Sequence, residues 1–370
     1  MPVSPNDLLT EDAAIRLLAG GDVVGCETDG ASVLLGDAAT VIIADPRDGL
    51  DVSGVWNSRR FHLHGPFVDE VGVRLFGHPP DSPEWSWNQR RDARPVHLLT
   101  RLPEGCVYLG VGTPRQAGYE DGCLTYAALT VEPELTPELL DRVRPPAEPG
   151  TLPALDWLTR MTADPLGALE RFVGDWFPET HQDLGGFDAA ARDVPGPLAA
   201  FYRLARHRPA LLGVQNRLRP PHAWRERCDG LVAFGDENQG GFTWLFDPSH
   251  PDPEVWIDQD GCEPRREHQP LSGFLLQFAV YEAMMNAPYK AVRSDLAAEH
   301  VDTLTAALTP VPWEPWRWPN DSTRFHVAPG LIAGTTDQWH GNTSVWVGAV
   351  HRSVLRPLGR LGIPWGDFDG

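Results

Sequence analysis

The sequence predicts an α+β protein with two domains: a β-rich one, followed by a mixed one that has an antiparallel sheet and flanking helices. Three observations lead to this fold class. The chain has 370 residues, which exceeds the ~150 residues of a typical domain. Short apolar runs between Gly, Pro and Asp turns are typical of strands. Longer amphipathic or apolar stretches, mostly in the second half of the chain, indicate helices.

The boundary between the two domains is predicted at residues 145–154. Four prolines and one glycine occur between Arg144 and Leu155, with almost no apolar side chain. Such a composition stiffens the backbone and cannot build a core. We therefore expect a β-rich accessory domain over residues 1–144, a Pro-rich linker over 145–154, and a C-terminal domain over 155–370.

The N-terminal domain is expected to open with a helix over residues 11–18 and to continue as strands. Its strands are predicted from apolar runs bounded by Gly, Pro or Asp. They lie at residues 23–26, 32–35, 41–44, 71–76, 96–101, 106–111 and 124–129. The most distinctive composition is WNSRRFHLHGPF at residues 56–67, together with Trp85 and Trp87. We recognise no family in this domain.

The C-terminal domain begins with an amphipathic stretch over residues 155–172, followed by a second helix that starts near Pro197. Three apolar runs separated by turns then predict an antiparallel meander. They lie at residues 231–234, 242–246 and 255–257. A helix over residues 271–286 is apolar around most of its circumference, as expected for a helix buried against a sheet. A further helix is predicted over residues 295–308, before a Trp/Pro-rich segment.

The charge of the chain disfavours nucleic acids and anionic membranes as partners. The formal net charge is −20, which repels phosphate groups and attracts cationic proteins. An acidic surface that serves only solubility is the ordinary alternative. The five cysteines are widely spaced and contain no C-x-x-C pair, which favours a reducing cytoplasm over a disulfide framework. Neither a signal peptide nor an uninterrupted membrane-spanning stretch is predicted.

Motifs for catalysis, cofactors and metals are weak. His62 and His64 would face the same side of a strand, as metal ligands require, but Asp69, His78 and His97 lack diagnostic spacing as a third ligand. A packing or surface role is favoured, and no metal is expected. The sequence contains no phosphate-binding loop and no nucleophile elbow, so no cofactor is expected either.

Two segments of the C-terminal domain can be read in two ways. Residues 236–239 (DENQ) lie between two apolar strands, where a polar hairpin tip is ordinary. The same carboxylates and amides can also hydrogen-bond the Arg and Lys groups of a partner. Trp313, Trp316 and Trp318 are either lids over a core or exposed binding residues, and lids are favoured.

The order of several motifs resembles the SUKH superfamily. These motifs are Pro197-Leu198-x-x-Phe201-Tyr202 on a helix, then GLVAFGDENQG at residues 230–240, then Trp244, Phe246 and Asp247. The resemblance covers roughly residues 155–290 and leaves residues 1–144 outside. The family includes a fungal cell-wall assembly regulator and many bacterial proteins that neutralise polymorphic toxins. It implies a mixed α/β fold with a protein-binding face and no shared catalytic residues.

We therefore expect a cytoplasmic, non-enzymatic protein-binding module, an immunity protein whose partner is a protein such as a basic toxin domain. Two alternatives stay open: a hydrolase with its active site in the N-terminal domain, and a regulatory scaffold. The residues expected to bind the partner lie at the hairpin tip and on the strands beside it. They are Asp236, Glu237, Asn238, Gln239, Trp244 and Trp256.

Overall fold

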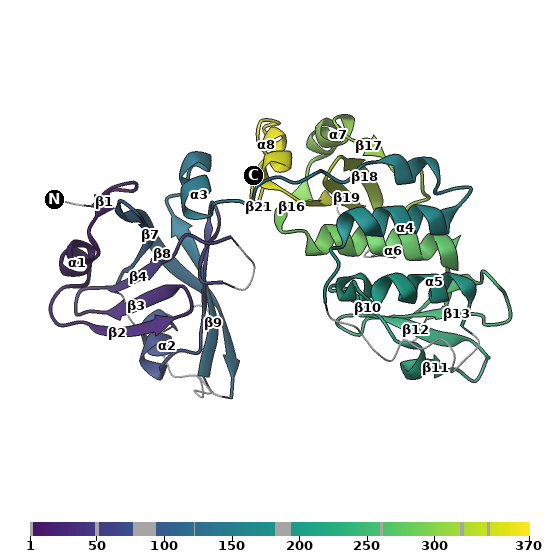
Figure 1. The fold of residues 1–370 in the computed structure, drawn as a ribbon, viewed down its shortest axis with the longest axis horizontal. Coiled ribbons are helices and arrows are strands. Elements are labelled where there is room, and N and C mark those ends of the chain that lie inside the picture. Colours follow the sequence, from purple (N-terminus) through teal and green to yellow (C-terminus); the bar gives the residue numbers. More distant parts are fainter. Residues whose placement is uncertain are drawn as a thin grey trace. The chain divides into compact units, whose positions relative to one another are not determined.

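The computed structural model describes residues 3–48, 52–76, 94–121, 123–181, 194–259, 262–318, 322–338 and 341–370. Contacts along the chain divide the protein into two units (Figure 1). The first contains Met1–Glu148 and Asp367–Asp369, and the second contains Pro149–Gly366 and Gly370. The division at Glu148 falls inside the predicted linker. Asp367–Asp369, however, group with the first unit and not with the expected C-terminal domain.

The first unit is built on one sheet in the order β2-β3-β4-β7-β8-β9-β6-β5, with β1 paired to β8. Its strands are β1 (Leu8–Leu9), β2 (Val24–Thr28), β3 (Ala31–Leu35), β4 (Thr40–Ala44), β5 (Gly54–Asn57), β6 (Arg60–His64), β7 (Val96–Leu102), β8 (Gly105–Glu120) and β9 (Cys123–Glu132). β4 and β7 are parallel. The other pairs described in this sheet are antiparallel.

The long strand β8 joins the two halves of this sheet. Its first part pairs with β7 as far as Val111, and the part from Val111 onward pairs with β9. Gly110, with φ of 137°, lies beside this change of partner. A Cβ at Gly110 would lie 2.3 Å from the carbonyl oxygen of Glu132, so only glycine fits there.

Helices cover both faces of the sheet. α1 (Glu11–Ala14) continues as a π-helical turn (Ile15–Ala19) on one face, beside the buried Ile43 and Leu99. The core on the other face includes side chains from α2 (Asp69–Phe76) and α3 (Pro137–Val143). The predicted strand over residues 71–76 is therefore wrong. Val71 and Leu75 are buried four residues apart, so helical spacing outweighs the β propensity of the valines.

The second unit contains two antiparallel sheets with helices. The helices are α4 (Pro165–Trp176), α5 (Gly196–Ala205), α6 (Leu271–Asn286), α7 (Ala298–Ala306) and α8 (Arg352–Gly359). One sheet follows the order β10-β12-β13-β14-β15, with β11 paired to β12. Its strands are β10 (Asn216–Leu218), β11 (Arg225–Glu226), β12 (Val232–Glu237), β13 (Thr243–Phe246), β14 (Glu254–Asp258) and β15 (Arg265–Pro270). The meander β12-β13-β14 confirms the antiparallel arrangement predicted for these runs.

The other sheet includes the order β17-β18-β19-β20-β16. Its strands are β16 (Tyr289–Leu296), β17 (Thr309–Pro310), β18 (Arg324–Ala328), β19 (Leu331–Asp337) and β20 (Thr343–Ala349). The short C-terminal strand β21 (Asp367–Phe368) belongs to the segment that groups with the first unit. The amphipathic stretch over residues 155–172 is not one helix. It is a 3-10 turn (Asp156–Thr159) followed by α4, which begins where Asp164 caps the backbone N–H of Gly167 at 2.9 Å.

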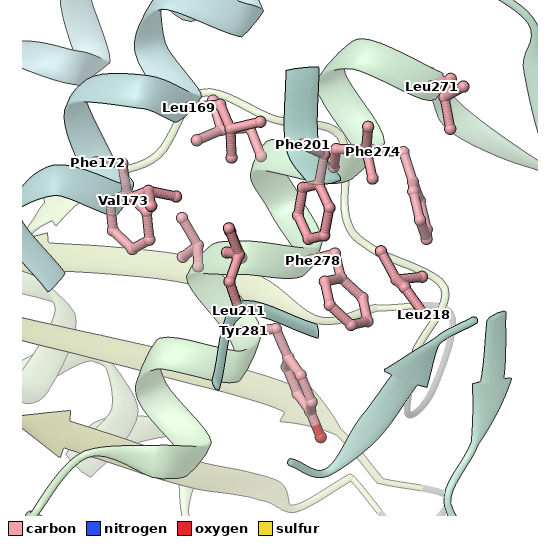
Figure 2. Close-up of a cluster of buried hydrophobic side chains, with 14 of the residues drawn as sticks. Leu169, Phe172, Val173, Phe201, Leu211, Leu218, Leu271, Phe274, Phe278 and Tyr281 are labelled. Atoms are coloured by element: carbon pink, nitrogen blue, oxygen red, sulfur yellow. The ribbon is translucent and has the colours of Figure 1, made fainter. Parts of the chain in front are cut away.

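Helix α6 lies in the middle of the core of the second unit. It contacts α4, α5 and strands of both sheets, and every residue from Leu271 to Met284 is buried. Figure 2 shows side chains of α4, α5 and α6 gathered in this core. β20 approaches the helix so closely that a Cβ at Gly348 would lie 2.3 Å from the carbonyl oxygen of Met284. The helix over residues 271–286 and its burial are confirmed, and its mostly apolar circumference follows from having core on all sides.

Phe274→Ala is expected to destabilise the second unit by about 3–5 kcal/mol, the usual cost of removing a buried phenylalanine ring. Phe274 is fully buried and packs against Phe234, Trp244 and Trp316. Denaturant unfolding followed by tryptophan fluorescence measures the change. Val214→Ala is the control, because that side chain is 53% exposed and should change the unfolding free energy by less than about 0.5 kcal/mol.

Candidate protein-binding site

The predicted acidic tip joins β12 to β13, and only part of it faces solvent. Asn238 and Gln239 are exposed. Glu237 is 5% exposed, and its carboxylate accepts hydrogen bonds from the backbone N–H groups of Gln239 at 2.8 Å and Gly241 at 3.0 Å. The prediction that Glu237 faces a partner is therefore wrong. Its carboxylate closes the turn by accepting from both of these backbone N–H groups.

Asp236 forms an ion pair within its own sheet. Both of its carboxylate oxygens accept from the guanidinium of Arg219, and Thr243 Oγ1 lies 3.3 Å from Oδ1. The side chains of Arg219 and Asp236 are 14% and 32% exposed. A bidentate pair of this kind neutralises much of the charge that Asp236 would offer to a partner.

The two predicted tryptophans lie on opposite faces of the sheet. Trp244 has no exposed surface and stacks on Trp316, so the prediction that Trp244 contacts a partner is wrong. Its Nε1 donates to Glu267 Oε1 at 3.3 Å. Trp256 is opposite Leu245 in the register between β13 and β14, one residue out of phase with Trp244. Because side chains alternate along a strand, Trp256 points to the outer face, where it is half-buried.

Trp256 lines a pocket of about 870 Å³. Carboxylates dominate its polar lining, and neither lysine nor arginine occurs among its lining residues in the described part of the chain. These residues are Leu231, Asp247, His250, Pro251, Asp252, Glu254, Trp256, Glu263 and Pro264. The pocket is thus an acidic cavity with an indole in its wall, formed by β14 and the turns on either side of it.

Two of the four carboxylates already have partners. Asp252 caps the start of α6, where it accepts from Ser272 N at 2.9 Å and Ser272 Oγ at 2.7 Å. Glu254 forms an ion pair with Arg266 at 2.5 Å, and both side chains are more than half exposed. Asp252 therefore has a structural role. The exposed ion pair between Glu254 and Arg266 is weak, so another cation can replace Arg266 beside Glu254.

The other two carboxylates are accessible. Hydrogen bonds from the hydroxyl and then the backbone N–H of Ser249 lower the pKa of Asp247, so this group stays ionised. His250 Nε2 lies 3.9 Å from Asp247 Oδ2. Glu263 is exposed and forms no ion pair with any described residue. The pocket therefore carries negative charge that the protein itself does not fully neutralise.

The carboxyl group of Glu282 on α6 is buried in the core of this unit. Glu282 has no exposed surface, and it accepts hydrogen bonds from three consecutive backbone N–H groups, of Val214, Gln215 and Asn216, at 2.7–3.0 Å. Burial raises the pKa of Glu282. These bonds hold the start of β10 against α6, so the role of Glu282 is structural.

The indoles of residues 313–318 mainly cover the core. Trp316 is 1% exposed, and Trp313 and Trp318 pack partly buried against the same cluster. The prediction that they are lids is confirmed.

In the first unit, His62 and His64 lie on β6 and share a face with aromatic neighbours. Trp56 stacks on His62 with ring centroids 4.1 Å apart, and the hydroxyl of Tyr126 lies 3.3 Å from His62 Nδ1. Burial, followed by the charges of His64, Arg60 and Arg144, lowers the pKa of His62 to about 3. His62 is therefore a neutral, packed imidazole. Within the described residues no group of three His, Cys, Asp or Glu side chains is arranged to hold a metal, and His78 lies outside them.

Comparison with family models, with curated proteins and with solved structures finds no match for this chain. All five cysteines are free. No helix in the described ranges is long and apolar enough to cross a membrane.

Glu267 gives a prediction for the pH dependence of stability. It is 3% exposed on β15, and burial raises its pKa from 4.5 to about 7. The folded state therefore binds this proton more tightly than the unfolded state. The contribution of this bound proton to the free energy of unfolding is complete below about pH 4.5. It is lost as the pH rises through 7, and the total loss is about 3 kcal/mol.

Glu267→Gln should remove this pH dependence and make the protein more stable than wild type at pH 8. The free energy of unfolding of both proteins, measured by urea denaturation from pH 4.5 to 8, gives the difference. Two parallel curves would show that Glu267 does not titrate in this range.

Proposed function

We propose that the second unit is a binding module for a basic protein. Following the resemblance to the SUKH superfamily, we propose further that this partner is a toxin domain. The module would neutralise the toxin in the cytoplasm by binding it, without catalysing a reaction. The observation that carries the proposal is the acidic pocket around Trp256 on the outer face of the meander sheet. It replaces the hairpin tip as the centre of the proposed binding face, because Asp236 and Glu237 are engaged within the protein.

The lining of the pocket suits the side chain of an arginine or lysine. An indole attracts a cation over its face, and carboxylates form charge-assisted hydrogen bonds with guanidinium and ammonium groups. Trp256 offers the indole, while Asp247 and Glu263 offer accessible carboxylates. The net charge of −20 supports the same class of partner, since it steers a basic protein toward the chain over long distances.

Capture from a lysate of the native host, with the tagged protein as bait, tests this proposal. Recovery of a protein with a basic domain, retained at low salt and identified by mass spectrometry, supports it. The association rate of that partner should fall as the salt concentration rises, because salt screens the attraction between opposite charges. An association rate that does not change with salt would contradict electrostatic steering.

Trp256→Ala combined with Glu263→Lys should weaken binding of the captured partner by at least about tenfold, because the double variant removes the indole and reverses one charge of the pocket. Biolayer interferometry with the purified pair measures the Kd. Glu299→Lys is the matched control: it makes the same charge change at an exposed position on α7, away from the pocket. Equal loss of affinity in both variants would mean that net charge alone, and not the pocket, determines binding.

A further inference from the structure

Another cavity of the second unit is lined by the C-terminal ends of α4 and α6. Its volume is about 230 Å³. Phe177, Ala283 and Ala287 line it, and each of them is at most 5% exposed. Pro178 and Pro288 line it as well and are exposed. The cavity therefore has a buried floor and an open mouth, so a molecule can enter it from solvent.

The space exists because small side chains line it. Ala283 and Ala287 are four residues apart at the end of α6 and so share one face of the helix. Ala210 adds a third small side chain from the 3-10 turn Pro209–Leu212. Close packing behind the helix holds this end in place, since a Cβ at Gly348 would lie 2.8 Å from the Cβ of Ala287. The helix therefore cannot shift to close the cavity without moving β20.

Hydrogen bonds fix the wall that follows α4. The backbone carbonyl of Phe177 accepts from Arg208 Nε at 3.0 Å, and the backbone N–H of Thr180 donates to the carbonyl of His207 at 2.8 Å. These bonds join the segment after α4 to the turn that contains Ala210. Two walls of the cavity are thus held together before any ligand binds, which lowers the cost of ordering the site.

The lining favours uncharged ligands. Among the described residues that line the cavity, none has an ionisable side chain, and Thr180 and Asn286 are the polar ones. A charge without a partner is costly to bury. At the end of α6 the N–H of Ala287 bonds to the carbonyl of Met284, and Pro288 has no N–H to offer. The last carbonyls of the helix therefore lack helical donors, and this end is the negative pole of the helix dipole. Anions are disfavoured, and a ligand with a hydrogen-bond donor is favoured.

We propose that this cavity is a binding site for a small, neutral aromatic molecule with one hydrogen-bond donor, such as a phenol. An apolar cavity of roughly 150 Å³ admits benzene, so a volume of about 230 Å³ accommodates a substituted ring. The described lining residues of this cavity and of the acidic pocket around Trp256 have no member in common. The proposal therefore does not rest on the proposed function.

A titration of the full chain, with ¹³C-labelled alanine methyl groups, tests the site. Phenol should give nuclear Overhauser effects to the methyl groups of Ala210, Ala283 and Ala287, with a Kd on the order of a millimolar, as expected for so small a ligand. Benzoate has a ring and a negative charge, and we expect it to bind at least about tenfold more weakly. Phenol without effects to these three methyl groups, or benzoate that binds as tightly as phenol, would overturn the proposal.

Ala210→Leu should fill part of the cavity and weaken phenol binding by at least about tenfold. Ala199→Leu is the matched control: it makes the same change at a half-buried alanine of α5 that does not line the cavity. Circular dichroism checks that both variants fold, and the methyl contacts of the wild-type chain decide the question if Ala210→Leu does not. If the two folded variants bind phenol equally well, the site is wrong.

Discussion

The burial of α6 is the constraint on which the second unit depends. A helix with no polar face needs apolar contacts in every direction, and here α4, α5 and two antiparallel sheets supply them. Polar side chains near the helix satisfy backbone N–H groups that this packing buries. Asp252 satisfies the N–H of Ser272 at the start of the helix, and Glu282 accepts from three backbone N–H groups ahead of β10. Since Asp252 also lines the acidic pocket, the burial of α6 and the shape of the proposed binding face are linked through one side chain.

The acidic residues of this chain fall into groups with different physical roles, which a count of charges cannot separate. Glu267 and Glu282 are core residues whose pKa is raised by burial. Glu237 closes a turn, and Asp236 neutralises Arg219. Asp247 and Glu263 remain accessible at the pocket. Of these six residues, only the last two can offer a carboxylate to the proposed basic partner at short range, whereas every ionised group adds to the long-range field.

The sequence predicted those parts of the fold in which a local pattern agrees with the final packing. The helix over residues 271–286 and the meander β12-β13-β14 that precedes it in the sequence are examples, because apolar periodicity and turn residues specify both. The strand predicted over residues 71–76 failed because Val71 and Leu75 satisfy a helical spacing that outweighs β propensity. Strands β18–β20 were missed although they form a local meander, in which Ala328 pairs with Leu331 and Asp337 with Thr343. The grouping of Asp367–Asp369 with the first unit had no local signal at all.

Site residues were harder to predict than elements for a related reason. Trp244 and Trp256 are equally aromatic and equally flanked by strand residues, yet one is core and the other lines a pocket, because the register of β13 against β14 places them on opposite faces. A shift of one residue would exchange their roles. The acidic turn around residues 247–252 was visible as a turn, but its carboxylates converge on Trp256 only after the sheet has formed. In so acidic a chain, the number of charges therefore says less about the proposed binding face than the position of the few carboxylates that the fold leaves accessible beside Trp256.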